Sequence, residues 1–400
     1  SQIFRCAKGH NWSFGAIWVY KLRKLGYYHE KAEFIAPYTL KVGKETITSK
    51  FILLCLGSEI AIPPIPGLDK VKYHTSDTIL DIDKLPENIT IIGGGYVAAE
   101  YGHFFSAMGS KVTIIGRNPQ FLPGEEPEIS ALALKQMSKH MKIVTNHEVV
   151  EVQGGFLGKK KLIAKDRATG KTIAIAADEI MVATGRVPNT DILHPEKSGI
   201  ELDKKGWVKT NQYLETSQPG IWALGDANGK FLFKHVANYE SQVVYYNAVL
   251  KRPMTAEYHA VPHAIFTYPE IAGVGMRQAE AIKAIGEANI LIGFYKYEDT
   301  AKGMAMGSEG HFVKVIVEAK TRKILGAHII GDQASVLIQE IINLMYTQSG
   351  SMMPLTMAMH IHPALNEVVD RAFGRLMSVA QYNHFQQHER GEAHAEPHNH

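Results

Sequence analysis

The 400-residue chain carries 43 Lys and Arg residues against 40 Asp and Glu residues, a net charge of +3, and 45% of its residues are hydrophobic. This length predicts two or three domains. The net charge is too small, and the basic residues too scattered, to indicate a nucleic-acid surface. No run of about 18 apolar residues is present, so we expect no membrane span and a cytoplasmic protein. Cys6 and Cys55 are too far apart for a disulfide framework or a metal site, and we expect free thiols.

The first 85 residues contain short β-type runs, AEFIAPYTLKVG and ETITSKFILLCLG, between residues 33 and 57. Pro and Gly interrupt these runs, as in an antiparallel meander. The stretch IAIPPIPGL (60–68) suits neither a strand interior nor a helix interior and predicts a connection. The first residue is Ser rather than Met, so the chain is expected to be a segment of a longer protein.

After residue 85 the pattern becomes strand, glycine turn, helix and strand, in NITIIGGG, YVAAEYGHFFSAMG and SKVTIIGRN. This alternation predicts a parallel sheet with crossover helices. Gly93, Gly95 and Ala98 take the three positions of a dinucleotide-binding turn: tight turn, close backbone approach, and packing of helix on strand. The alternative is a glycine-rich turn in an unrelated sheet, and the flanking strands and helix favour the dinucleotide site.

The strand at 112–115 ends in Gly116 and Arg117, and the next acidic residue is Glu125. An acid at this position would bind the ribose 2′-OH of NAD, whereas an arginine accommodates the 2′-phosphate of NADP. The sequence therefore predicts NADP(H), with NAD(H) less favoured. The alternative is that Arg117 is a solvated strand-end residue.

The remaining elements are expected in the following order. A helix at about 127–140 and the strand of EIMVATGRVPNT complete the first unit, and GIWALGDANG (220–229) starts another, followed by the helix-compatible NYESQVVYYNAVL. After Tyr258 the strands HFVKVIVEA and ILGAHIIG and a helix near 333–346 indicate an α+β region. Residues 381–400 are polar and predict a disordered, His-rich tail. Its histidines (His384, His388, His394, His398 and His400) are expected to be solvated, with weak metal binding as the alternative.

Five ordered motifs resemble those of the pyridine nucleotide-disulfide oxidoreductase family: CLGSEIAIPPIPG (55–67), ATGRVPNT (183–190), TSQPGIWALGDA (216–227), FTYPEIAGVG (266–275) and HIHPALNE (360–367). The resemblance implies an α/β flavoprotein with two dinucleotide-binding domains and a C-terminal α+β dimerisation domain. It implies a partial FAD-binding domain (1–85), an NAD(P)-binding domain (86–205), a return segment of the FAD domain (206–258) and a dimerisation domain (259–380).

The resemblance also implies FAD as cofactor and assigns residues to it. Asp226 would bind the flavin ribityl and pyrophosphate region, and the segment Leu232 to Ala237 would line the isoalloxazine. Tyr96 and Glu100 match positions that border the nicotinamide pocket. The alternatives are a helix-capping Asp226, a core Tyr96 and a surface Glu100. The other cofactor-binding positions carried over are Gly57, Gly185, Gly225, Leu232, Phe233, Lys234, His235 and Ala237.

His362 and Glu367 are the candidate catalytic residues. A neutral imidazole can take a proton from a thiol, and a carboxylate on its other nitrogen fixes the tautomer. In the resembled family such a pair serves the disulfide of the partner subunit, which implies a homodimer. The alternative is a loop histidine held by Pro363. His360 offers an HxH pattern, but without a third ligand we expect no metal site.

The family's amino-terminal GxGxxG unit and its CxxxxC redox disulfide are not found in this sequence, and truncation is the expected reason. No cysteine follows Cys55, which argues against mercury reduction. The expected function is an FAD-dependent NAD(P)H:disulfide oxidoreductase, most like dihydrolipoamide dehydrogenase, acting on a small-molecule or lipoyl-type disulfide. The alternatives are a mycothione-type or other low-molecular-weight disulfide reductase, a flavin NAD(P)H oxidase, and a nucleotide-binding module without catalysis.

Overall fold

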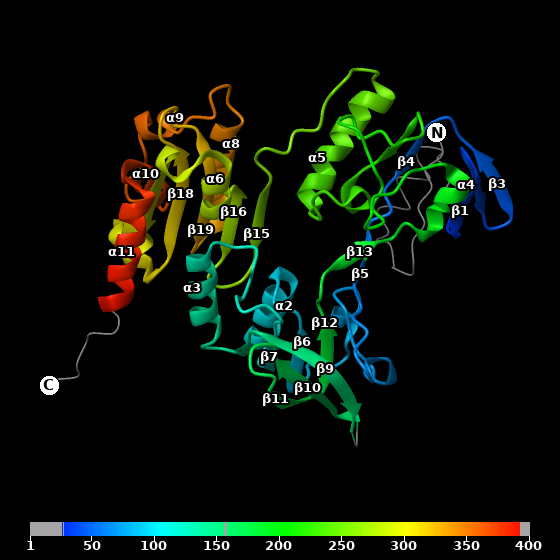
Figure 1. Cartoon of the computed structure of the whole chain (residues 1–400), viewed down its shortest axis with the longest axis horizontal. Helices are drawn as coiled ribbons and strands as arrows, with labels where there is room; N and C mark the ends of the chain where they lie inside the picture. Colours follow the sequence, from blue (N-terminus) through cyan, green and yellow to red (C-terminus); the bar gives the residue numbers. More distant parts are fainter. Residues whose placement is uncertain (1–25, 27, 156–157, 393–400) are drawn as a thin grey trace. The chain divides into compact units, whose positions relative to one another are not determined.

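The computed structural model describes residues 26, 28–155 and 158–392, and these residues form two compact units (Figure 1). Unit 1 combines the described residues up to Ala61 with Arg186–Tyr258. Unit 2 combines Ile62–Gly185 with the described residues from His259 onward. Within the described ranges, no helix has the length and apolar character needed to cross a bilayer.

The domain boundaries expected after residues 85 and 205 are not those of this division. The chain instead passes from unit 1 to unit 2 after Ala61 and returns to unit 1 after Gly185. Residues 62–85 belong to unit 2, where the His74 backbone N–H donates to the Ile180 carbonyl at 2.8 Å. Residues 186–205 belong to unit 1, where Arg186–Pro188 forms a strand of that unit.

Unit 1 contains the predicted antiparallel meander, but only as far as residue 48. The apolar run Ile52–Leu54 instead pairs in parallel with Ile221–Ala223, a partner far along the chain that local patterning does not specify. Both strands contribute to a core with Phe34. The elements of unit 1 are β1 (Ala32–Ala36), β2 (Thr39–Val42), β3 (Glu45–Thr48), β4 (Ile52–Leu54), β5 (Ser58–Ile60), β13 (Arg186–Pro188), α4 (Pro195–Ser198), β14 (Ile221–Ala223), α5 (Lys234–Val244) and a π-helical segment (Tyr245–Val249).

The first part of unit 2 is the predicted parallel sheet with crossover helices, in the strand order β12-β6-β7-β8. Its strands are apolar and buried, as expected for a parallel sheet covered on both faces. An antiparallel three-stranded sheet accompanies it. The elements are β6 (Asn88–Ile92), α2 (Tyr96–Ala107), β7 (Lys111–Ile115), α3 (Pro127–Met137), β8 (Lys142–Val144), β9 (His147–Gly154), β10 (Lys160–Asp166), β11 (Thr172–Ala177) and β12 (Glu179–Val182).

The second part of unit 2 is the predicted α+β region, built on a six-stranded sheet in the order β15-β16-β19-β18-β17-β20. The strands expected in HFVKVIVEA and ILGAHIIG are β18 and β19, and the helix expected near 333–346 is α8. The elements are β15 (Pro262–Ile265), β16 (Ile271–Gly275), α6 (Gln278–Ile285), β17 (Ile290–Lys296), α7 (Ala301–Met306), β18 (Phe312–Glu318), β19 (Ile324–Ile330), α8 (Ala334–Met345), α9 (Met353–Met357), α10 (Glu367–Gly374), β20 (Leu376–Ser378) and α11 (Val379–Glu392).

The prediction of a disordered tail from residue 381 is wrong as far as Glu392, because residues 379–392 form helix α11. Val379 and Tyr382 are each only 1% exposed, and the rings of Tyr382 and Phe385 both pack on Phe294. The low overall hydropathy of the segment hid this stripe of apolar residues spaced by three. His384 and His388 are exposed on the helix, while His394, His398 and His400 lie outside the described residues.

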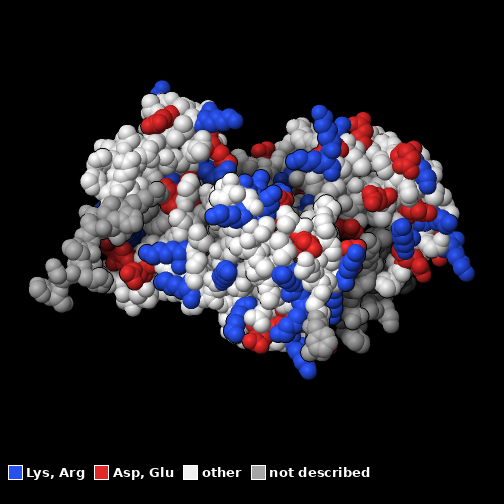
Figure 2. All heavy atoms as spheres, turned by 60° about the horizontal axis from the view of Figure 1, so that its bottom comes forward, with Lys and Arg blue, Asp and Glu red and all other residues white. Residues whose placement is uncertain are grey.

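On the face shown in Figure 2, Lys and Arg side chains stand among Asp and Glu side chains and are separated by uncharged residues. This distribution agrees with the near balance of charges in the sequence.

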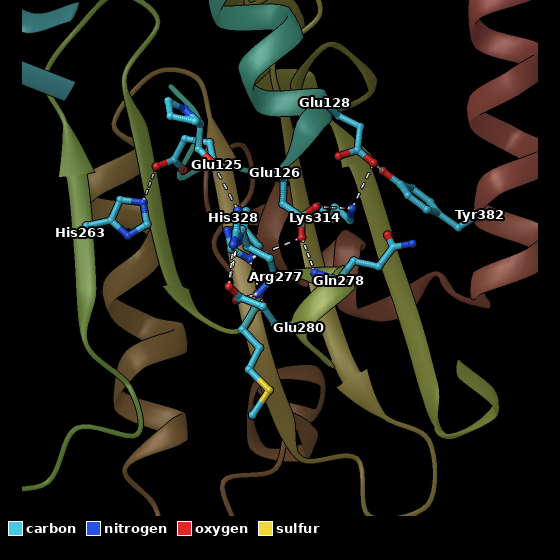
Figure 3. A network of polar contacts seen from close by, with 12 residues as sticks. Glu125, Glu126, Glu128, His263, Arg277, Gln278, Glu280, Lys314, His328 and Tyr382 are labelled. Carbon is cyan, nitrogen blue, oxygen red and sulfur yellow. Dashed lines mark hydrogen bonds and ion pairs between the residues drawn. The ribbon is translucent and has the colours of Figure 1, made fainter. Parts of the chain in front are cut away.

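A row of polar positions crosses the six-stranded sheet where α3 begins (Figure 3). His263, Gly273, His328 and Lys314 are successive partners across β15, β16, β19 and β18, so these positions share one face. Carboxylates from the segment preceding and starting α3 lie against this row. We refer to Glu125, Glu126, Glu128, His263, Lys314 and His328 as the α3–sheet cluster.

Lys314 is the fully buried centre of this cluster. Its ammonium lies 3.1 Å from Glu126 Oε2 and 3.1 Å from Glu128 Oε1, and 4.7 Å from the centre of the Tyr382 ring. Burial alone would raise the pKa of the Glu128 carboxyl, but the Lys314 charge and the hydrogen bonds from Lys314 and Tyr382 lower it below its ordinary value. Glu128 therefore stays ionised inside the protein.

We expect Glu128→Gln to make folding stability less dependent on pH. Because the folded-state pKa of Glu128 is lowered, its carboxylate stabilises the fold fully above about pH 4.3, and this stabilisation is lost as pH falls through the lower folded-state value. The variant should thus be less stable than the wild type at pH 7, and the gap should narrow below about pH 4. Urea unfolding across this range measures the gap. Glu87→Gln, which removes an exposed ion pair with Lys111, is the control, and a gap that stays constant down to pH 3 would contradict the expectation.

Candidate active site

The glycine turn joins β6 to α2, and its three glycines face different surroundings. Gly93 has φ +137°, and a Cβ added there would stand 2.2 Å from the Ala183 carbonyl oxygen. A Cβ on Gly94 would stand 3.1 Å from the Cα of Gly116. Beside Gly95, in contrast, no described atom lies within 4 Å. Packing thus requires the first two glycines, whereas Gly95 leaves the backbone open to an approaching group.

Helix α2 presents its N-terminus at this open position. Among the described residues no side chain caps it, and its first turn contains no acid. Ala98 is completely buried against the sheet, which agrees with its expected packing role. Gly185, after β12, has φ +105° and also faces open space within the described part of the chain. The unsatisfied N–H groups and the positive end of the helix dipole suit a phosphate.

Tyr96 and Glu100 lie one turn apart on α2 and therefore share a face. Tyr96 is 38% exposed, so it is not a core residue. The Glu100 carboxylate accepts the backbone N–H of Phe266 at 2.9 Å. Partial burial raises the pKa of this carboxyl, and the hydrogen bond from Phe266 only partly opposes the effect. Glu100 is thus a half-buried group that links α2 to the residue after β15. The alternative that Glu100 is simply a surface residue does not account for this contact.

Arg117 is exposed just beyond β7. A second arginine, which the sequence reasoning missed, stands beside it: Arg167 Nη1 donates to the Arg117 carbonyl at 3.0 Å. Asp166 fixes the turn that carries Arg167, because its Oδ1 accepts the Ala168 N–H at 2.7 Å. Arg167 comes from the β10–β11 hairpin, and a basic turn residue 50 positions from Arg117 gives no local signal of this pairing.

In unit 1, Asp226 lies in the turn that follows β14. Its Oδ2 accepts the Ser58 hydroxyl at 2.5 Å and lies 3.5 Å from Arg186 Nε. Asp226 therefore links the turn after β14 to the first residues of β5 and β13, and it does not cap a helix. The neighbouring Gly57 has φ +67°, and an added Cβ would meet no described atom within 4 Å. The carboxylate thus stands beside backbone that is open to a ligand.

A buried carboxylate holds the Asp226 turn from behind, and the sequence reasoning missed it. Glu240 is completely buried, and its oxygens accept the Gly225 N–H at 2.6 Å, the Asn228 side-chain amide at 3.0 Å and the Tyr258 hydroxyl at 2.5 Å. Burial and the Glu240 carboxylate both raise the pKa of the Tyr258 hydroxyl, which stays protonated as a donor. The available signal was an acid within the apolar stripe of α5, whose other buried members are valines.

The segment Leu232–Ala237 forms the start of α5, whose N-cap is Phe233. Among the described residues no side chain caps this N-terminus, and its first turn has no acid. The Phe233 and His235 rings stack with centres 5.3 Å apart. Ala237 packs on the Asp226 turn, since a Cβ added to Gly225 would stand 3.0 Å from the Ala237 Cβ. A second helix N-terminus is therefore placed beside a glycine turn.

His362 and Glu367 form the expected pair. His362 Nδ1 lies 3.0 Å and 3.1 Å from the two Glu367 oxygens, while the imidazole is 69% exposed. The hydrogen bond from His362 lowers the pKa of Glu367 below its ordinary value. A carboxylate on Nδ1 favours the tautomer with the proton on that nitrogen, which leaves Nε2 available for proton exchange.

The predicted residues fall into three groups. Gly93 and Gly95 follow β6 and Gly185 follows its parallel partner β12, so these glycines lie beyond the C-terminal ends of neighbouring strands, and Ala98 lies in the first turn of α2. In unit 1, Gly225 precedes Asp226, and Gly57 precedes Ser58, whose hydroxyl donates to Asp226. His362 pairs with Glu367 at the start of α10. In the described ranges, no three His, Cys, Asp or Glu side chains are grouped as a metal would require.

Comparison with known proteins assigns a family to most of the chain. Residues 11–254 match the pyridine nucleotide-disulphide oxidoreductase family, and residues 261–373 match the dimerisation domain of that family. Mycothione reductase of Mycobacterium tuberculosis (strain H37Rv) is 38% identical over 336 residues, covering 82% of this chain and 71% of that protein. Dihydrolipoyl dehydrogenase of Synechocystis sp. is 34% identical over 338 residues, with the same two coverages of 82% and 71%.

Among solved structures, the Cu(II) complex of the HOCl-induced flavoprotein disulfide reductase RclA from Escherichia coli superposes with a TM-score of 0.79 at 25% identity. The match covers 88% of this chain and 80% of that one. The chain therefore belongs to the pyridine nucleotide-disulfide oxidoreductase family, and its fold is that of a two-dinucleotide flavoprotein followed by an α+β dimerisation domain.

Proposed function

We propose that this protein passes electrons from NADPH through FAD to a disulfide substrate, as a homodimer. The observation that carries the proposal is the coexistence in one chain of an open glycine turn at the start of α2 and an exposed imidazole held by a carboxylate, His362–Glu367. The first arrangement suits a dinucleotide pyrophosphate, and the second suits proton exchange with a thiol.

The residues of both nucleotide sites fit the groups assigned to them. Gly95, Gly185 and Gly57 border space where even a Cβ would meet no described atom, and α2 and α5 offer helix N-termini that no described side chain caps. When bound, FAD supplies a two-electron carrier between a nicotinamide and a disulfide. The chain's part is to hold phosphates at the two helix N-termini, to orient the ribityl region with Asp226, and to exchange a thiol proton at His362 Nε2.

Disulfide reduction is favoured over the reverse reaction by the nucleotide preference. Arg117 and Arg167 place two cations at the end of β7, which suits the 2′-phosphate of NADPH. A low-molecular-weight disulfide, of the kind in the name of the 38% identical relative, is the first candidate substrate. A lipoyl group is the second, because a dihydrolipoyl dehydrogenase is 34% identical over a similar length.

A substrate panel tests this proposal on protein expressed from its whole reading frame. Mycothiol disulfide, lipoamide and glutathione disulfide are each offered with NADPH, and we expect one of them to be turned over well above the others. NADPH consumption that needs only oxygen would instead identify a flavin oxidase. Nucleotide binding without any turnover by a colourless protein would identify a binding module.

We expect Arg117→Glu to exchange the preference for NADPH with one for NADH. The substitution places a carboxylate against the 2′-phosphate and in reach of a ribose 2′-OH. Arg167→Gln should weaken NADPH binding without creating a preference for NADH. The neutral glutamine removes a positive charge that attracts the 2′-phosphate, but it does not repel that phosphate. The measurement is the ratio of kcat/KM for NADPH to that for NADH. An unchanged ratio in Arg117→Glu would contradict the assignment of NADPH.

A further inference from the structure

The loop between β7 and α3 connects the nucleotide turn with the six-stranded sheet. The Leu122 backbone N–H donates to the Gly94 carbonyl at 3.0 Å, in the middle of the glycine turn. Leu122 itself is 2% exposed and has φ +51°, so its conformation depends on the surrounding contacts. The Glu125 N–H donates to the Leu122 carbonyl at 3.0 Å, and Gln120 Nε2 donates to the Glu125 carbonyl at 3.2 Å. The hydrogen bond from Leu122 to Gly94 thus joins the loop to the glycine turn, and the other two hold the loop itself together.

The α3–sheet cluster fastens the other end of this loop (Figure 3). Glu125 Oε1 lies 2.8 Å from His263 Nε2, and Glu126 Oε2 lies 3.1 Å from Lys314 Nζ. Glu126 Oε1 also accepts the backbone N–H of Gln278 at 2.5 Å. These carboxylates are nearly inaccessible, with 6% and 2% of their side chains exposed. Buried charges in such contacts resist displacement, because a separated carboxylate would be left unpaired in a dry environment.

We infer that Lys314 is a positioning residue for NADP(H): through Glu126 and the loop at 121–126, it holds the Gly94 carbonyl and hence the open approach at Gly95. The inference rests on the proposed binding of NADP(H) at this turn. It gives the dimerisation domain a part in nucleotide binding through a chain of contacts within unit 2.

The test compares Lys314→Met with the loss of another buried lysine that pairs with a glutamate. Lys160 is 7% exposed and lies 2.7 Å from Glu179. Glu179 starts β12, at the N-terminal edge of the parallel sheet, whereas the glycine turn lies at the C-terminal edge of that sheet. Lys160→Met is therefore the control. Two readouts are taken on the FAD-loaded dimer: the Kd for NADP⁺, and amide hydrogen exchange in peptides covering 93–99 and 118–126. A purely structural role would affect both variants alike.

We expect Lys314→Met to raise the Kd for NADP⁺ at least about fivefold, the lower end of a typical coupling between sites, and to speed exchange in both peptides. Lys160→Met should change neither. Should Lys314→Met fail to fold, the triple variant Lys314→Met/Glu126→Gln/Glu128→Gln removes the charges together and leaves none unpaired.

Unchanged exchange and unchanged Kd in a folded variant would overturn the inference. The failure of the proposed function has a different signature: the wild type would not bind NADP⁺ at all, and the exchange measurement would still report whether the cluster holds the turn.

Discussion

His362→Gln should slow disulfide turnover by about 10²–10⁴-fold, the usual contribution of a general acid–base group, while NADPH still bleaches the flavin at the wild-type rate. A glutamine side chain has no group that takes up and releases a proton as the His362 Nε2 does, although its amide can still hydrogen-bond to Glu367. Stopped-flow absorbance separates the two half-reactions, since flavin bleaching reports the nucleotide step and thiol release reports the disulfide step.

His360→Gln is the matched control, because His360 stands two residues away and lies 4.0 Å from Asp370, outside the His362–Glu367 pair. We expect it to retain disulfide turnover. Equal losses in both variants would mean that the loop conformation, and not proton exchange at His362, supports the reaction.

Glu240→Ala should yield a protein that folds less stably and retains little FAD. The substitution removes the acceptor for the Gly225 N–H, the Asn228 amide and the Tyr258 hydroxyl, and each buried donor left unpaired costs about 1–3 kcal/mol. The turn that carries Asp226 would then lose its support. The ratio of flavin to protein after purification and the thermal unfolding midpoint are the two measurements.

Glu215→Ala provides the comparison within unit 1, because the Glu215 carboxylate likewise accepts a glycine N–H, that of Gly220, at 2.7 Å. This variant should lose stability but keep its flavin. If Glu240→Ala keeps a full complement of FAD despite a lower midpoint, Glu240 supports the fold alone and not the cofactor site.

The glycine turn was predictable from sequence because its determinants are local. Gly93 and Gly95 stand between a strand and a helix, Ala98 follows at a fixed spacing in the first turn of that helix, and the structure forms the strand, turn and helix there. His362 and Glu367 are likewise only five positions apart, so the same short segment that suggested the pair also builds it.

Arg167 and Glu240 could not be found in this way, since their significance depends on partners distant in sequence. Arg167 meets Arg117 only because the β10–β11 hairpin folds toward the end of β7, and Glu240 meets Gly225 only because α5 turns back on β14. The pairing of β4 with β14 was missed for the same reason. Helix α11 was missed for another: three apolar residues on one face suffice to bind a helix whose average composition is polar.

The most direct test of electron transfer between the two nucleotides is anaerobic addition of NADPH to the purified protein. A yellow dimer whose flavin absorbance bleaches in proportion to added NADPH, and recovers on addition of the disulfide substrate, is the predicted result. A protein that holds FAD yet keeps its oxidised spectrum with excess NADPH, while dithionite bleaches it, would contradict the claim that the two sites exchange electrons.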